Sequence, residues 1–131
     1  MIFLDSSVII AVSNPLDENF EDGKRLFSTA FSSGEAIVIT THVFDESLTY
    51  IRKKLGPQKS ETLLSLLMQN KQIEIAFPER QVFTSAAQLF SKHKKFSFCD
   101  ALSLAVMNSY GIRKILSFDS DFDLPGVERL Y

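Results

Sequence analysis

The sequence predicts an α/β fold built on a central, mainly parallel sheet of four to five strands. Short apolar runs alternate along the chain with amphipathic stretches of ten or more residues. Strands joined by helices of that length favour a parallel sheet with right-handed crossovers. The 131 residues suit a single domain, and no repeat or Pro/Gly-rich linker divides them, so we expect one domain over residues 1–131.

The first 70 residues are expected to form two strands and four helices. The strands are short, buried apolar runs at Met1–Leu4 and Ala36–Ile39. Helices are indicated by apolar residues at helical spacing and by the breakers between them, Asn14-Pro15, Gly34 and Gly56-Pro57. In chain order the helices cover Val8–Val12, Glu21–Ser33 (capped by Asn19 or Asp17), Thr41 or His42 to Leu55, and Lys59–Asn70.

The remaining residues continue the alternation. Strands are expected at Ile73–Phe77 and Lys114–Phe118, with a short edge strand over Val127–Leu130. A helix over Glu79–His93 is amphipathic, and one over Phe98–Tyr110 is apolar almost all round, begins at Ser97 and ends at Gly111. The 12 Phe residues sit at core spacing, and with no Trp and 3 Tyr they do not predict a stacking surface for bases.

Composition excludes several classes of protein. The formal charge is −2 and the pI is 5.6, against the pI above ~9 typical of domains that hold nucleic acid by bulk charge. The single cysteine, Cys99, excludes an internal disulfide and a cysteine-rich zinc site. The opening MIFLDSSVIIAV has no basic segment, and no apolar run reaches the ~18–20 residues of a membrane span. We therefore expect a soluble, cytoplasmic protein without membrane contact.

The small net charge hides an uneven distribution. Residues 1–50 carry 8 acids and 2 bases, residues 51–95 carry 3 acids and 9 bases, and residues 96–131 carry 5 acids and 3 bases. Solvated helix faces explain most single charges, but the clustering suggests a basic middle that could hold phosphates. The candidate RNA-backbone contacts in it are Arg52, Lys53, Lys54, Lys59, Lys92, Lys94 and Lys95.

Three acids stand out because of their positions. Asp5 and Asp119 follow predicted strands, and chemistry in parallel sheets collects outside the carboxyl ends of strands. Asp100 is the only charge in the apolar helix Phe98–Tyr110, where an ionised carboxylate is costly unless it is compensated. Structural alternatives exist, since Asp5 can cap a helix and Ser97 with Asp100 resembles a capping box.

A fourth acid lies in the helix that ends at Leu55. Its expected core stripe is Phe44, Leu48, Ile51 and Leu55, and both Asp45 and Glu46 fall off that stripe. Periodicity therefore suggests that either acid is solvated and leaves the choice between them open. His42, His93 and Cys99 have no partner at ligand or nucleophile spacing and read as structural residues.

Four segments together resemble the PIN-domain family of small metal-dependent ribonucleases, which includes the VapC-type toxins. The resemblance spans nearly the whole chain and rests on IFLDSSVI, ITTHVFDESL, FSFCDALSLAVMNSYGI and ILSFDSDF, in this order and spacing. It implies a three-layer α/β/α sandwich. It also implies a catalytic and metal-binding cluster of Asp5, Glu46, Asp100 and Asp119, with accessory positions at Ser7, Ser117 and Asp121.

The resemblance further implies hydrolysis of single-stranded RNA, a cognate antitoxin and a homodimer. An all-oxygen ligand set favours Mg²⁺ or Mn²⁺, and such an ion can activate water against a phosphodiester. The other interpretation is a non-catalytic PIN module that binds RNA or a protein partner. Similar folds with phosphoryl-transfer chemistry are disfavoured because Ser7 stands where a phosphatase of the haloacid-dehalogenase type has a second Asp.

Overall fold

The computed structural model describes residues 1–131 and consists of five strands, six α-helices and one 3-10 helix. The strands are β1 (Ile2–Leu4), β2 (Ile37–Thr40), β3 (Ile73–Ala76), β4 (Lys114–Leu116) and β5 (Glu128–Leu130). The helices are α1 (Ser6–Ser13), α2 (Phe20–Ser32), α3 (Thr41–Leu55), α4 (Pro57–Gln69), α5 (Arg80–Lys92), α6 (Phe98–Tyr110) and the 3-10 helix η1 (Ser120–Phe122). None of the helices combines the length and apolarity needed to cross a membrane.

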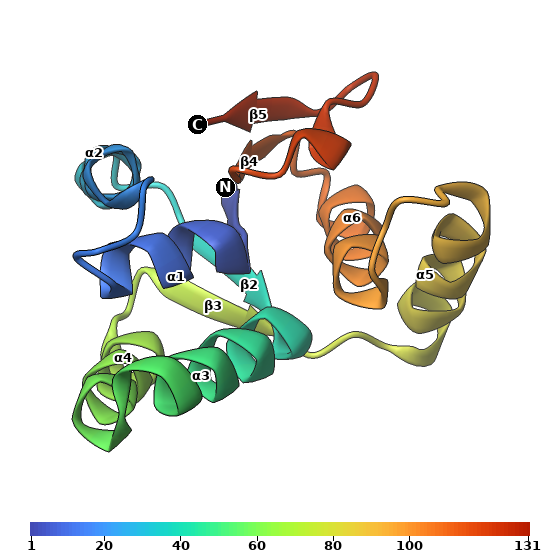
Figure 1. Cartoon of the computed structure of the whole chain (residues 1–131). Helices are drawn as coiled ribbons and strands as arrows, with labels where there is room; N and C mark the ends of the chain where they lie inside the picture. The colour runs from blue at the N-terminus through green and yellow to red at the C-terminus, as the bar shows by residue number, and fades with distance from the viewer.

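All five strands pair in parallel, in the order β3-β2-β1-β4-β5, which confirms the predicted sheet. Helices α1–α4 lie on one side of this sheet and α5 and α6 on the other, so the molecule has three layers (Figure 1). The chain steps outward from β1 to β2 and β3, then returns to β4 on the far side of β1. Ligand sites of parallel sheets form outside the carboxyl ends at such a reversal.

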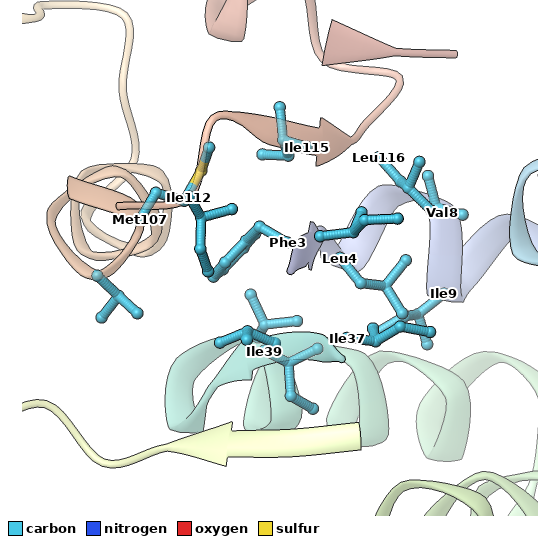
Figure 2. Packing of buried hydrophobic residues seen from close by; sticks show 14 of the residues in the cluster. Phe3, Leu4, Val8, Ile9, Ile37, Ile39, Met107, Ile112, Ile115 and Leu116 are labelled. Atoms are coloured by element: carbon cyan, nitrogen blue, oxygen red, sulfur yellow. The ribbon is translucent and has the colours of Figure 1, made fainter. Parts of the chain in front are cut away.

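The core surrounds the central strand β1. All three of its residues are buried, because helices cover both faces of the sheet there. Phe3 is fully buried and pairs in register with Val38 of β2 and Ile115 of β4, and Figure 2 shows it among isoleucines from these strands. Continuous apolar runs are typical of strands buried on both faces. This packing holds the ends of β1 and β4 side by side.

The buried stripe of α3 is offset from the predicted one. Its buried residues are Val43, Ser47 and Ile51, whereas Phe44 and Leu48 are only partly buried. The helix begins one residue after Thr40, whose hydroxyl accepts a hydrogen bond from the Val43 amide at 3.1 Å. The offset results from α3 packing between the sheet and its helical neighbours, which periodicity alone does not reveal.

Strand β4 ends at Leu116, two residues earlier than predicted. The Ser117 amide still donates to the Leu130 carbonyl at 3.1 Å. From Phe118 on, side-chain hydroxyls replace backbone carbonyls as acceptors: the Phe118 amide donates to Ser7 Oγ at 3.1 Å, and the Asp119 amide donates to Ser117 Oγ at 3.0 Å. The chain therefore leaves the sheet at the point where Ser117 lies beside the end of β1. Asp119 belongs to the turn after the strand and not to the strand end itself.

The observed ends of the helices differ from the predicted ones by no more than two residues. Helix α1 begins at Ser6, directly after Asp5, and α4 begins at Pro57, a favoured first helical position. Asn19 occupies the cap position of α2 without a side-chain cap, while the Asp17 carboxylate accepts from the Asn19 amide at 2.8 Å.

The expectation that every Phe belongs to the core is wrong for Phe77, Phe83 and Phe90, which are exposed.

The two outer strands carry charged residues. Glu74 in β3 is exposed, and β5 contains Glu128 and Arg129. Both strands are short, with four residues in β3 and three in β5. These edges are therefore poor templates for pairing with another strand.

Candidate functional site

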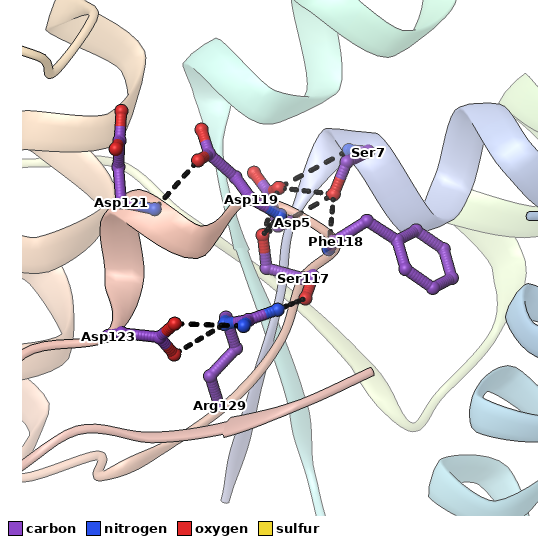
Figure 3. A network of polar contacts seen from close by, with 8 residues as sticks. All are labelled: Asp5, Ser7, Ser117, Phe118, Asp119, Asp121, Asp123 and Arg129. Atoms are coloured by element: carbon purple, nitrogen blue, oxygen red, sulfur yellow. Dashed lines mark hydrogen bonds and ion pairs between the residues drawn. The ribbon is translucent and has the colours of Figure 1, made fainter.

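Asp5 lies at the carboxyl end of β1 and is 4% exposed. Its Oδ2 accepts hydrogen bonds from Ser7 Oγ at 2.6 Å and from Ser117 Oγ at 2.7 Å, as Figure 3 shows. The backbone amide of Ser7 also donates to Oδ2, at 3.4 Å, so Asp5 is the cap of α1. These bonds join the ends of β1 and β4 across the reversal in strand order and leave the other oxygen, Oδ1, for a further ligand.

Asp100 lies in the first turn of α6 and belongs to a complete capping box. Its Oδ2 accepts from the Ser97 amide at 2.7 Å, and the Asp100 amide donates to Ser97 Oγ at 3.1 Å. A capping box satisfies backbone donors at the helix start and fixes the acid that takes part in it. The carboxylate is thus held by one oxygen, and Oδ1 is left over.

Asp119 caps η1 in the same manner. Its Oδ1 accepts from the Asp121 amide at 2.8 Å, and its own amide donates to Ser117 Oγ. Ser117 therefore contacts Asp5 through its hydroxyl hydrogen and Asp119 through its oxygen. This single serine connects two of the candidate acids (Figure 3).

The three aspartates share one arrangement. In each, one carboxylate oxygen accepts a local backbone hydrogen bond at the start of a helix, and no hydrogen bond engages the second oxygen. The capping interpretation of Asp5 and Asp100 is correct, and it does not compete with a role as ligand. The cap immobilises one oxygen of the carboxylate and leaves the other one free.

Glu46 lies on the exposed side of α3. Burial raises the pKa of the Cys99 thiol well above its usual range, and the charges of Glu46, Asp5 and Asp100 raise it further. Glu46 therefore lies within electrostatic reach of Cys99, as Asp5 and Asp100 do. The thiol stays protonated, which agrees with its prediction as a structural residue.

Burial shifts the ionisation of two of the acids, and neighbouring charges add to the shift of Asp100. Burial raises the pKa of Asp5, although the hydrogen bonds from Ser7 and Ser117 oppose the shift. Burial also raises the pKa of Asp100, and the charges of Asp5 and Asp119 add to it against the opposing bonds from Ser97. The structure thus brings Asp5, Asp100 and Asp119 within electrostatic reach of one another, in a place where water does not fully compensate their charge.

The donor set fits a hard divalent cation. Carboxylate and hydroxyl oxygens are the ligands of Mg²⁺ and Mn²⁺, and a cation would compensate the charge that burial disfavours in Asp5 and Asp100. The side chains do not, however, converge into a set of three or more ligands around one point. The residues that would hold an ion are those with free oxygens, Asp5, Asp100 and Asp119.

The candidate basic residues fall into two groups. Arg52 is engaged within the helical layer, since its guanidinium donates to Ser60 and Glu61, and the Lys59 ammonium donates to the Ser13 carbonyl at 3.4 Å. Lys53 and Lys54 are exposed on the last turn of α3.

The second group lies beside Asp121. Lys92, Lys94 and Lys95 line a hollow with Asp121, and the Lys95 ammonium is 4.0 Å from Asp121 Oδ1. Roles for either group as RNA contacts stay predictions.

Arg129 is a site residue that the sequence analysis missed. It holds Asp123 with a bidentate pair of hydrogen bonds, 2.7 Å from Nε to Oδ1 and 2.9 Å from Nη2 to Oδ2. Its Nη1 donates to the carbonyl of Ser117 at 3.3 Å, so it supports the serine that contacts Asp5 and Asp119 (Figure 3). The sequence gives only a weak indication of this role, namely an arginine in an edge strand six residues after an acid in the preceding turn.

Comparison with known proteins gives concordant results. Residues 2–127 match the model of the PIN domain. The 23S rRNA-specific endonuclease VapC20 of Mycobacterium tuberculosis is 27% identical over 128 residues, which cover 96% of this chain and 95% of that protein. A VapC ribonuclease of Archaeoglobus fulgidus is 30% identical over 98 residues, covering 72% of this chain and 61% of its own length.

Solved structures extend the likeness to three dimensions. The crystal structure of Mycobacterium tuberculosis VapC20, described as a Sarcin-Ricin loop cleaving toxin, has a TM-score of 0.87 and 25% identity, with 98% of this chain and 97% of that chain covered. A toxin–antitoxin complex from Klebsiella pneumoniae shares the fold, with a TM-score of 0.68 and 18% identity over 98% of this chain and 96% of that one. By sequence match and by architecture, this chain belongs to the PIN-domain family.

Proposed function

We propose that this chain is a divalent-metal-dependent endoribonuclease that cleaves phosphodiester bonds in single-stranded RNA, and that it is the toxin of a toxin–antitoxin pair. The observation that carries the proposal is the shared arrangement of Asp5, Asp100 and Asp119, each held by one oxygen with the other free. Membership of the PIN-domain family and likeness to ribonucleases over nearly the full length support it. The active unit is one nuclease domain over residues 1–131.

The residues of the chain act mainly by placing negative oxygens where a cation and a phosphate meet. Ser7 and Ser117 orient Asp5, Ser97 orients Asp100, and the turn amide of Asp121 orients Asp119. The starts of α1 and α6 lie at this edge, and the partial positive charge of helix N-termini favours both carboxylates and a phosphate. A bound Mg²⁺ or Mn²⁺ would activate water and stabilise charge on the scissile phosphate.

The partners follow from the relatives and from the family. VapC20 is described as a toxin that cleaves the Sarcin-Ricin loop, and a structure of the same fold belongs to a toxin–antitoxin complex. We extend RNA as the substrate and a protein antitoxin as the regulator to this chain. A homodimer is the assembly that the family resemblance favours.

RNA cleavage with and without metal tests the proposal. The purified chain should cleave single-stranded RNA with Mg²⁺ or Mn²⁺ and stop when EDTA is added. Asp100→Asn and Glu46→Gln should each lose activity by about a hundred-fold or more, because each removes charge from the site. Cleavage of a fluorophore–quencher RNA gives the rate.

Asp45→Asn is the matched control, since Asp45 is exposed next to Glu46 on α3 and should keep its activity. Cleavage that persists in EDTA, or full activity of Asp100→Asn, contradicts the mechanism. RNA binding without cleavage under every metal condition would instead identify a non-catalytic PIN module.

A further inference from the structure

The turn that follows β4 carries Asp119 and is fastened at both of its ends. We call residues 117–123 the acidic turn, because acids stand at 119, 121 and 123. At its start, the Ser117 hydroxyl donates to Asp5 Oδ2 at 2.7 Å, and at its end the Asp123 carboxylate accepts from Arg129. The position of Asp119 therefore depends on what holds these two ends.

Arg129 contacts both ends of the acidic turn. Its Nε and Nη2 donate to the two oxygens of Asp123 at 2.7 and 2.9 Å, and its Nη1 donates to the Ser117 carbonyl at 3.3 Å (Figure 3). A guanidinium presents its donors in a rigid, planar fork, so these contacts fix the two ends relative to each other. Lysine, with one ammonium on a flexible stem, does not reproduce this arrangement.

The Arg129 side chain is shielded from water although it stands in an edge strand. It is 8% exposed, and the ring centroid of Tyr131 lies 3.9 Å from its guanidinium carbon. By contrast, the pair of Arg25 and Asp22 on α2 is 61% exposed at both side chains. Shielded charges are screened less by salt than exposed ones, so the contact with the acidic turn is the firmer of the two.

Arg129 acts on Asp119 without binding it. Hydrogen bonds to Asp123 raise the pKa of Arg129, burial opposes the shift, and the charge of Asp119 adds to the rise, so Asp119 lies within electrostatic reach. No hydrogen bond joins the two side chains, and Asp119 Oδ1 accepts from the Asp121 amide. The guanidinium therefore holds the backbone that carries Asp119 and leaves its second oxygen free.

The acidic turn has an apolar anchor as well. Phe122 is fully buried, and its ring centroid lies 5.4 Å from that of Phe96. This contact attaches the turn to the core independently of Arg129. Loss of the guanidinium should therefore loosen the turn without unfolding the chain.

We propose that Arg129 is a positioning residue of the acidic site, which fixes the acidic turn through Asp123 and the Ser117 carbonyl so that Asp119 keeps its orientation. The inference rests on the proposed function and adds to it a residue that touches neither the cation nor the RNA. A reacting group misplaced by about 1 Å can lower a rate by about 10²-fold. A looser turn is therefore enough to impair cleavage.

The first test measures the turn itself and needs neither metal nor RNA. Amide hydrogen exchange by NMR reports on the Asp119 and Asp121 amides, which donate to Ser117 Oγ and Asp119 Oδ1. Arg129→Met should accelerate their exchange by about ten-fold through local opening. The Asp5 amide donates to a carbonyl of β4 at 3.0 Å and should exchange at an unchanged rate, since it reports on the sheet.

Three further variants sharpen this test. Arg129→Lys keeps the charge but not the fork, so it should give an intermediate acceleration. Asp123→Asn breaks the same pair from its more exposed side, since the Asp123 side chain is 56% exposed, and should accelerate the same amides even if Arg129→Met does not fold. Arg113→Met is the matched control, because Arg113 is an exposed arginine directly before β4.

The second test places the effect in the reaction. Arg129→Met should lower kcat for RNA cleavage by about ten-fold or more with little change in KM. It should also weaken the binding of Mn²⁺ in the absence of RNA, measured by electron paramagnetic resonance. In an Asp119→Asn background the same substitution should have no further effect on either quantity, because the residue through which it acts is already lost.

Several outcomes overturn the inference. Equal acceleration of the Asp5 amide would assign Arg129 to the stability of the whole sheet, and unchanged exchange in the acidic turn would show that Arg129 does not hold it. Additive losses in the Asp119→Asn background, or a raised KM with unchanged kcat, would indicate direct contact with the RNA. A parent chain that cleaves no RNA removes the proposed function together with the inference, whereas an active parent with a fully active Arg129→Met removes the inference alone.

Discussion

At the scale of single residues, capping and ligation combine in the same carboxylate. An Asp at a helix start reaches its own backbone amides with one oxygen, because its side chain is short. The second oxygen is then directed by a cap and not by a freely rotating side chain. Asp5, Asp100 and Asp119 all use this device. A Glu in place of Asp5 or Asp119 would lose the cap geometry, so at these two positions a structural requirement and a functional one select the same residue type.

The buried charge of Asp5 predicts a pH dependence of stability. Folding raises the pKa of this carboxyl group from its ordinary value of 3.8, because burial disfavours the charged form. A raised pKa contributes stability that is complete below the ordinary value and is lost as the pH rises through the folded-state pKa. Relative to Asp5→Asn, the wild-type chain without divalent metal should therefore lose thermal stability as the pH rises from the ordinary pKa of 3.8 towards neutrality.

Melting temperatures of the two chains across this range check the prediction, with Asp45→Asn as the exposed control. Addition of Mg²⁺ at neutral pH should raise the melting temperature of the wild type more than that of Asp5→Asn, since only the wild type retains the full charge that a cation compensates. A gap between the two chains that does not vary with pH would show that Asp5 carries no buried charge.

The candidate acids differ in how well the sequence alone predicts them as site residues. Asp5 and Asp100 could be singled out, because one follows a buried strand and the other is the only charge in an apolar helix. Glu46 could not, since the expected stripe of Phe44 and Leu48 placed it on the solvent side. Both Asp45 and Glu46 are exposed, as periodicity predicts, so the choice of Glu46 rests on the family resemblance and stays a prediction.

At the scale of elements, helix starts define the site more than the strands do. The capping box of Ser97 and Asp100 serves the stability of α6 and the orientation of an acid at once. Ser97→Ala should therefore destabilise the chain by about 0.5–2 kcal/mol and also reduce RNA cleavage. Chemical denaturation and the cleavage assay measure the two effects, and Ser91→Ala on the exposed face of α5 is the control. Stability loss with full activity would separate the cap from the site.

Helix α3 carries a polar group whose removal should strengthen the fold. Ser47 is fully buried and its hydroxyl has no hydrogen-bond partner. Because an unsatisfied buried hydroxyl costs about 1–3 kcal/mol and Ala is the better helix former, Ser47→Ala should raise the free energy of unfolding by about 1 kcal/mol. Ser103 in α6 is equally buried but donates to the Cys99 carbonyl at 2.8 Å, so Ser103→Ala should gain less.

Denaturation curves of both serine variants give the comparison directly. The prediction fails if Ser47→Ala is no more stable than Ser103→Ala.

Element order was predictable throughout, while several boundaries were not. Apolar runs and the breakers Gly34, Gly56-Pro57 and Gly111 located the elements in the right sequence. The end of β4 was missed because Ser7, more than a hundred residues away in the chain, accepts the Phe118 amide. Such long-range side-chain acceptors leave no local mark in the sequence, so strand ends that contribute to a site are the hardest to place.

At the scale of the whole molecule, the small net charge is the sum of the charges of acidic and basic regions that lie apart. Lys92, Lys94 and Lys95 line a hollow with Asp121, whereas Lys53 and Lys54 lie in the last turn of α3. A strand of RNA that crosses the site could contact the first group, the second, or both. Phosphate contacts orient the chain without reading its sequence.

Salt dependence distinguishes these possibilities. Each lysine that neutralises a phosphate of single-stranded RNA adds about 0.7 to the slope of log affinity against log salt. In the Asp100→Asn background, Lys53→Gln/Lys54→Gln should lower the slope by about 1.4 if both bind phosphates. Filter binding at several salt concentrations measures it, with the exposed Lys24→Gln on α2 as the control. An unchanged slope removes Lys53 and Lys54 from the RNA path.

The charged outer strands have a consequence for how copies of the chain can associate. A sheet that ends in Glu74 on one side and in Glu128 and Arg129 on the other resists extension by a strand from a neighbouring molecule. Routes that begin with edge-to-edge pairing, including fibril growth and strand exchange, are therefore disfavoured even at high local concentration. Self-association is left to the helical faces, where contacts can be broken without disturbing the sheet that holds the acids in place.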